Sequence, residues 1–249
     1  MARLLDAFQE APRACSYLPG QLATLDIRLS VDVTADELGV LLAHGWRRFG
    51  PTYFRPACAA CDACIPTRVP VATFHASGSQ RRAHRKASTL TRTVQVPRVD
   101  DERLDLYARW HRHRESVRGW EASPLTEEGY AMEFTFPHPS VREVTYRDPA
   151  RGNRLIGLGI VDEVPNALSA VYFFWDPDHA PPSLGTAHIV GLIGDAATRG
   201  LAWVYLGYLV EACPSLAYKQ HFQPQESLIG RPIDGEHPVW MVRRTAGGD

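Results

Sequence analysis

The chain has 249 residues, of which 45% are hydrophobic and 22% charged, as expected for one large or two small globular domains with a packed core. Its net charge of −1 excludes a uniformly basic nucleic-acid-binding protein, so any such surface must be a local patch. No apolar run reaches the roughly 18 residues of a membrane helix, and the N-terminus lacks the apolar core of a signal peptide, so we expect no membrane partner and a cytoplasmic protein.

The N-terminal part predicts a short strand and a capped helix. Residues 24–29 alternate polar and apolar side chains, which is typical of a strand with one buried face. Thr34 and Glu37 have the spacing of a capping box, in which each side chain bonds the other residue's backbone. Leucines follow at helical spacing, and Gly45 is expected to end this helix.

Three cysteines, Cys58, Cys61 and Cys64, follow at two-residue gaps, and Cys15 lies upstream. Thiolates at this spacing can converge on one centre if the loop curls, and a closed site needs a fourth ligand. Cys15 is the best candidate, because Cys213 lies far along the chain. We expect an iron–sulfur cluster or a zinc ion held by four cysteines, with reduced thiols in a loop of small residues as the alternative.

A basic patch surrounds the cysteine motif. Residues 77–99 carry six Arg or Lys side chains and no Asp or Glu. Arginine forks suit phosphate contacts, although a solvated helix face is the alternative for a charge run. The residues expected to contact a nucleic acid are Arg47, Arg48, Arg55, Arg68, Arg81, Arg82, Arg85 and Lys86.

The second half begins with a helical pattern over residues 100–135, in which the polar run 110–115 could line a site or be an exposed helix end. Short turns then join apolar segments, which indicates an antiparallel meander. A helix that begins near Ser183 and stops at Gly200 precedes one more strand. The predicted strands are 141–146, 154–161, 168–175 and 203–209.

This order of elements is that of N-acetyltransferase-like folds. The expected fold class is therefore α+β, with a cysteine-cluster domain over residues 1–99 and an N-acetyltransferase-like (GNAT-like) domain over residues 100–249. A fold analogy alone does not give function.

The motifs resemble those of one family over nearly the whole chain. They include Cys15-x-Tyr17-Leu18-Pro19, the Cys58–Cys64 motif with its flanking arginines, Ser79-Gln80-Arg81-Arg82, Ser183-Leu184-Gly185-Thr186 and Ala217-Tyr218-Lys219. They resemble the bacterial aminoacyl-tRNA–protein transferases similar to aspartate/glutamate leucyltransferase, which have the eukaryotic arginyl-tRNA–protein transferases as relatives. Gly78 stands where that family usually has Arg, a departure that bears on specificity more than on reaction class.

The resemblance implies an enzyme that moves leucine, or another amino acid, from aminoacyl-tRNA to the α-amine of proteins that begin with Asp or Glu, in the N-degron pathway. Relatives hold an iron–sulfur cluster or zinc through their N-terminal cysteines, and the basic patch would hold tRNA phosphates. The alternatives are an arginyl-tRNA–protein transferase, a non-catalytic tRNA-binding or iron–sulfur sensing module, and an acyl-CoA N-acetyltransferase.

An aminoacyl ester is already activated, so the enzyme must position the amine, remove a proton and stabilise an oxyanion. A tyrosine or an aspartate could orient or deprotonate the amine, and a lysine could bind the acidic side chain of the acceptor. For each aromatic residue, core packing is the alternative role. The candidate catalytic residues are Tyr172, Trp175, Asp176, Tyr205, Tyr208 and Lys219.

Overall fold

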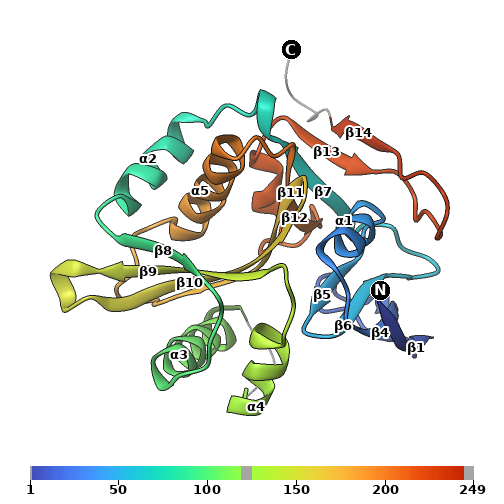
Figure 1. The fold of residues 1–249 in the computed structure, drawn as a ribbon, viewed down its shortest axis with the longest axis horizontal. Helices are drawn as coiled ribbons and strands as arrows, with labels where there is room; N and C mark the ends of the chain where they lie inside the picture. Colours follow the sequence, from blue (N-terminus) through green and yellow to red (C-terminus); the bar gives the residue numbers. More distant parts are fainter. Residues whose placement is uncertain (1, 119–124, 244–249) are drawn as a thin grey trace.

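A computed structural model describes residues 2–118 and 125–243 of the chain. Its centre is an eight-stranded sheet in the order β14-β13-β7-β12-β11-β10-β9-β8, and a four-stranded sheet, β1-β4-β6-β5, lies beside it (Figure 1). The strands are β1 Arg3–Gln9, β2 Arg13–Ala14, β3 Leu22–Ala23, β4 Leu25–Val31, β5 Arg47–Phe49, β6 Thr52–Pro56, β7 Ile65–Pro70, β8 Thr91–Gln95, β9 Val141–Asp148, β10 Arg154–Val164, β11 Ala167–Trp175, β12 Trp203–Leu209, β13 Gln225–Leu228 and β14 Trp240–Arg243. The α-helices are α1 Ala35–Ala43, α2 Gly78–Ala87, α3 Asp101–Arg118, α4 Glu127–Tyr130 and α5 Leu184–Thr198.

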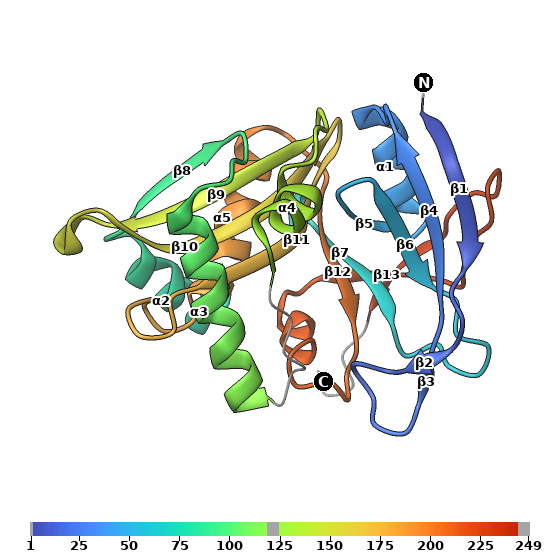
Figure 2. The same cartoon turned by 90° about the horizontal axis from the view of Figure 1, so that it is seen from below.

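The predicted meander of β9, β10 and β11 is confirmed, and both of its internal pairings are antiparallel. Strand β12 instead pairs parallel with β11, as the helix between them requires. This pairing covers only three residue pairs and ends at Ser169 and Tyr205. Beyond that point β11 runs on to Trp175 and β12 to Leu209 without pairing to each other, so the two strands diverge (Figure 2).

Helices cover both faces of the large sheet. Helices α2 and α5 lie on one face, and α3 and α4 on the other (Figures 1 and 2). On the first face, Ala83, Leu192 and Ala196 pack with Val204 in one apolar core. On the second face, aromatic side chains of α3, α4 and the following π-helix (Ala131–Thr135) form a second core with β10 and β11. A single layer of strands is thus buried on both sides, which fixes the positions of the strand ends.

The small sheet packs with α1 against the large sheet. Trp46 and Tyr53 lie in a third core with Ala167 and Tyr205, which belong to the two diverging strands. The predicted capping box of α1 is confirmed, since Thr34 and Glu37 bond each other's backbone amides. Strand β5 is thereby held beside β11 and β12.

The expected division at residue 99 does not coincide with the edge of the large sheet. Strands β7 and β8 come from the first 99 residues but are members of the eight-stranded sheet. Strand β7 begins at Ile65, directly after the cysteine motif, and a 3₁₀ turn (Val71–Thr73) follows it. Residues 119–124 of the predicted helical stretch lie outside the described residues. None of the described helices has the length and hydrophobicity needed to cross a membrane.

Candidate active site and cysteine centre

The four cysteines of the predicted centre gather at one end of the small sheet. Cys15 follows β2, and the other three occupy the loop between β6 and β7. Burial, together with the nearby charges of Cys15, Cys58 and Cys61, raises the pKa of the Cys64 thiol to about 12. Cys15, Cys58 and Cys61 therefore lie within electrostatic range of Cys64, and the convergence of the four sulfurs on one bound group stays a prediction.

The donor set at this centre fits a metal or cluster. Backbone amides lie 3.4 Å from two of the sulfurs, from Tyr17 to Cys15 Sγ and from Thr24 to Cys58 Sγ. Thiolate ligands are deprotonated and need such donors and a cation to offset their charge. Arg231 holds the loop by donating to the carbonyls of Cys58 and Cys61. The residues suit an iron–sulfur cluster or zinc, and the bound group itself stays a prediction.

A groove of about 800 Å³ lies beside this centre. It runs between the cysteine loop and the C-terminal hairpin of β13 and β14, and Cys64 is part of its wall. Three arginines, Arg55, Arg231 and Arg243, also line it. This basic lining could bind an anionic chain.

The predicted nucleic-acid contacts fall into two groups. The residues on α2 are exposed on the outer face of that helix, where phosphate contacts are open to them: Arg81, Arg82, Arg85 and Lys86. Arg55 and Arg68 are only partly buried and already hold Asp26 and Glu226, respectively. Arg68 also lies between the rings of Trp203 and Trp240.

Arg47 and Arg48 lie inside the protein, so the structure corrects their expected role at the RNA surface. Their exposed fractions are 6% and 5%. Arg48 forms a buried ion pair with Asp162 of β10. Arg47 lies over the rings of Tyr205 and Tyr208, at 5.4 and 5.6 Å from their centroids. Strand β5 directs both side chains into the interface between the two sheets, where tRNA phosphates have no access.

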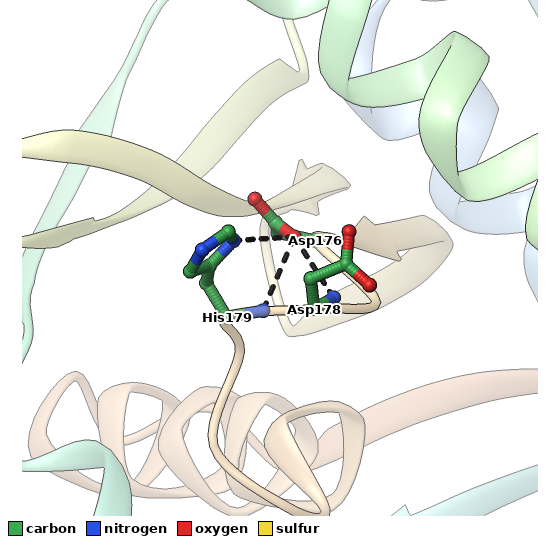
Figure 3. Close-up of side chains that lie close together, drawn as sticks. All are labelled: Asp176, Asp178 and His179. Carbon is green, nitrogen blue, oxygen red and sulfur yellow. Dashed lines mark hydrogen bonds and ion pairs between the residues drawn. The ribbon is translucent and has the colours of Figure 1, made fainter.

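Asp176 is fully buried, and its two carboxylate oxygens have different sets of partners. Its Oδ1 accepts from the backbone amides of Asp178 and His179 and from the His179 ring (Figure 3). Its Oδ2 binds Arg109 at 2.5 Å and Arg154 at 3.1 Å. These partners outweigh burial and hold the pKa of Asp176 below its usual value. The carboxylate is thus a poor proton acceptor, and its contacts favour a structural role over the predicted catalytic one.

The same turn brings three metal-ligand side chains together, because Asp176, Asp178 and His179 lie within 4.8 Å of one another. Two guanidinium groups already neutralise Asp176. The hydrogen bonds among the three residues explain their proximity, and we interpret the group as a turn.

Tyr172 and Trp175 lie on β11 and face α3. The Tyr172 hydroxyl lies 3.1 Å from His111 Nε2, and Trp175 packs on Trp110 at 3.7 Å between centroids. Burial lowers the pKa of His111 and raises that of Tyr172 to about 12, so both groups are neutral near pH 7. A neutral imidazole beside a phenol can pass a proton between the two.

Tyr205, Tyr208 and Lys219 lie together beside Arg47. The Tyr208 hydroxyl donates to the carbonyls of Gly45 and Phe54 and so joins the two sheets. The Lys219 ammonium donates to the carbonyl of Tyr208 at 2.7 Å. Burial, together with the Arg47 charge, lowers the pKa of Lys219 to about 7. This amine can therefore hold or release a proton at neutral pH.

Two residues of the site were missed among the sequence candidates. His111 bonds Tyr172, and the guanidinium of Arg114 lies over Trp110 at 4.1 Å and near Trp175 at 5.3 Å. Their signal was the polar run 110–115 at the end of a helix whose other face is apolar. That run alone could not show which of its side chains turn towards β11.

The geometry of the diverging strands and the residues around them indicates a class of protein. Two parallel strands diverge after a short pairing, and the residues around the divergence are aromatic or cationic, with proton-transfer groups among them. This arrangement is that of N-acyltransfer enzymes with a GNAT-like fold.

Comparison with known proteins gives the family. The N-terminal model of arginine-tRNA-protein transferase matches residues 13–82, and the C-terminal model matches residues 102–229. The chain belongs to this family and is an aminoacyl-tRNA–protein transferase.

Curated relatives of the same family match this chain over most of its length. An aspartate/glutamate leucyltransferase of Helicobacter hepaticus is 33% identical over 241 residues, which are 96% of this chain and 98% of the relative. One of Ruegeria pomeroyi is 36% identical over 88% of this chain and 80% of the relative. Among solved structures, L-PGS from Bacillus licheniformis covers 70% of this chain and 50% of its own, with 14% identity and a TM-score of 0.43.

Proposed function

We propose that the protein transfers leucine from leucyl-tRNA to the N-terminal α-amine of proteins that begin with Asp or Glu, and so marks them for the N-degron pathway in the cytoplasm. The observation that carries this proposal is the similarity to aspartate/glutamate leucyltransferases over almost the entire length of both chains. The family name points to arginine as the other donor, and that is the second candidate.

The reaction needs no covalent intermediate with the enzyme, because the aminoacyl ester is already activated. The ester carbon of the aminoacyl group is attacked by the acceptor amine, the C–N bond forms, and the bond to the 3′-terminal ribose oxygen breaks. The amine gives up a proton, and the ribose oxygen takes one. Positioning of the two substrates and stabilisation of the oxyanion supply most of the rate.

The residues around the strand divergence can perform these steps. The neutral pair of His111 and Tyr172 is suited to accept the proton of the amine and return one to the leaving oxygen. Trp175, half-buried and packed on the buried Trp110, offers an apolar face on which the leucine side chain can pack.

The exposed face of α2 and the groove beside Cys64 are suited to tRNA. Arg81 and Arg85 are exposed on the helix, and three further arginines line the groove. Phosphate contacts of this kind give affinity without reading sequence. Selection of leucyl-tRNA would then depend on the aminoacyl group.

The cysteine centre fits a structural role. Cys15, Cys58, Cys61 and Cys64 would hold an iron–sulfur cluster or zinc, which would cross-link the N-terminal segment to the loop before β7. Such a link stabilises a region with little apolar core of its own. The centre would thereby fix the groove wall to which Cys64 belongs.

A transfer assay under anaerobic conditions tests the proposal. Purified protein is mixed with tRNA charged with radiolabelled leucine or arginine and with peptides that start with Asp, Glu or Ala. Label from leucyl-tRNA on the Asp and Glu peptides alone supports the proposal, and label from arginyl-tRNA alone supports the second candidate. Binding of tRNA without transfer would support a non-catalytic module, and acetyl transfer from acetyl-CoA without tRNA binding would support an acetyltransferase.

A further inference from the structure

Three arginines are buried in the described part of the chain, and one of them has no acidic partner. Arg48 and Arg103 each bind a buried carboxylate. Arg47 makes one hydrogen bond, from Nη1 to the carbonyl of Trp46 at 2.8 Å, and its Nε and Nη2 have no partner there. A buried charge without a counter-ion destabilises a fold, so its presence indicates a use.

A second buried cation lies close to the first. Lys219 is 8% exposed, donates to a backbone carbonyl, and has no carboxylate within 4.0 Å among the described residues. Gly207 lies between the two, with a φ of +80°. A Cβ placed there would lie 3.5 Å from Lys219 Nζ and 3.8 Å from Arg47 Nε. Both cations thus face the small volume that the absent side chain leaves beside Gly207.

We propose that Arg47, assisted by Lys219, binds the side-chain carboxylate of the acceptor's N-terminal residue and so selects Asp and Glu. This inference rests on the function proposed above. The free nitrogens of Arg47, Nε and Nη2, form one edge of the guanidinium, and that edge binds a carboxylate through two parallel hydrogen bonds. Asp162, the carboxylate whose charge reaches Arg47, is already bound to Arg48.

The position of the site favours an acceptor side chain over a tRNA phosphate. Gly207 lies two residues beyond the last pairing of β12 with β11, where the strands diverge. The carboxylate of an N-terminal Asp or Glu is only a few bonds from the reacting amine, so its binding site must lie next to the place of transfer. A carboxylate at the end of a short side chain can enter a buried position, whereas a phosphodiester joined to two sugars needs an open surface such as that of α2.

The test compares peptides that differ only in this charge. We expect the wild-type protein to prefer an Asp peptide over the matching Asn peptide by roughly 100-fold in kcat/KM. In Arg47→Gln, transfer to the Asp peptide should fall by roughly 100-fold and transfer to the Asn peptide by less than about threefold, so the preference disappears. Arg151→Gln, on an exposed turn at the tip of the β9–β10 hairpin, is the matched control and should keep the wild-type preference.

Two outcomes would overturn the proposal, and a second variant tests it if Arg47→Gln does not fold. Equal losses on both peptides with weaker leucyl-tRNA binding would assign Arg47 to a tRNA phosphate. Arg47→Lys keeps the charge but lacks the fork, and it should lose about tenfold of the Asp preference even if Arg47→Gln does not fold. A full Asp preference in a folded Arg47 variant refutes the inference alone, whereas a wild-type protein that labels no acidic peptide refutes the proposed function.

Discussion

Arg48 of β5 and Asp162 of β10 form a buried ion pair that joins the small sheet to the large one. Arg47, the residue before it in β5, is equally buried and has no such partner. One strand therefore carries a structural arginine and an arginine available to a ligand. The two can be separated by experiment.

Replacement of these neighbours by methionine should change stability in different directions. Arg48→Met leaves the Asp162 carboxylate buried without a partner and should lower the free energy of unfolding by about 3–5 kcal/mol. Arg47→Met removes an unpaired buried charge and should leave stability unchanged or raise it. Urea denaturation of both variants measures the difference, and a large loss in Arg47→Met would show that this residue is structural.

Asp176→Asn should act on the fold and not on the reaction. Asp176 binds Arg109 and Arg154, and the loss of its charge should cost about 3–5 kcal/mol of stability. Below the melting transition, turnover per folded molecule should stay within about threefold of the wild type, because the carboxylate does not serve as a base. The control is Asp178→Asn, whose side chain is exposed and which should melt like the wild type. A stable variant with a large loss of turnover would restore the catalytic role.

Charge reversal on α2 should weaken tRNA binding alone. Arg81→Glu with Arg85→Glu changes two exposed side chains, so the melting temperature should stay close to that of the wild type. Binding of tRNA should weaken, and the slope of log affinity against log salt should fall by about one for each lost contact. Arg3→Glu, on the exposed strand β1, reverses one exposed charge away from α2 and should bind tRNA normally. Equal effects of the two charge reversals would mean that α2 holds no specific contact.

His188 should make the protein sensitive to acid. Arg92 donates to the Tyr146 hydroxyl, which lies 3.1 Å from Nδ1 of the buried His188 ring. Burial lowers the pKa of His188 to about 3. Between about pH 6.5 and 3, His188 is protonated in the unfolded chain but not in the folded protein. The contribution of His188 to the free energy of unfolding is therefore full above pH 6.5 and falls by about 1.4 kcal/mol per pH unit below it.

His188→Gln should remove that part of the pH dependence. Urea denaturation at pH 7.5, 6 and 5 should show a shallower fall in stability for the variant than for the wild type. His138, whose pKa burial also lowers to about 3, should contribute a fall of the same sign that the variant retains. Identical slopes in variant and wild type would contradict the assignment of His188.

The cysteine centre predicts a defined metal content. Protein purified without oxygen should contain iron with acid-labile sulfide, or zinc, and Cys64→Ala should lose most of it because a closed site needs all its ligands. Cys213→Ala is the matched control, since that thiol is buried beside Ser215 and lies outside the gathered set of four. Elemental analysis measures the iron and zinc content of both variants. Equal metal content in Cys64→Ala and Cys213→Ala would exclude the four-cysteine site.

The elements with strong local signals were predictable from the sequence. The capping box of Thr34 and Glu37 and the meander of β9, β10 and β11 depend on short-range spacing, and the structure has both. Strands β5, β6 and β8 were not predicted, because β5 and β6 are only three and five residues long and the partner of β8, strand β9, lies far along the chain. Sequence spacing also could not show that β7 enters the large sheet.

The site was predicted by residue type more than by role. The sequence indicated a cationic and aromatic site, and Tyr172, Lys219 and Arg47 do gather around the strand divergence. Whether an arginine faces solvent or a buried carboxylate depends on tertiary packing, so Arg48 could not be distinguished from Arg81. Asp176 is a carboxylate at a strand end, a type of residue that often takes part in catalysis. Only its ion pairs with Arg109 and Arg154 show that its charge is neutralised within the fold.

Transfer from an equimolar mixture of leucyl-tRNA and arginyl-tRNA to a peptide that starts with Asp tests the proposed function most directly. Mass spectrometry of the product identifies the added residue and its position. Leucine on the α-amine of the Asp peptide, with no product from the matching Ala peptide, is the expected result. Arginine on the same amine would move the protein to the other branch of its family, and no product from protein with a filled cysteine centre would contradict transfer altogether.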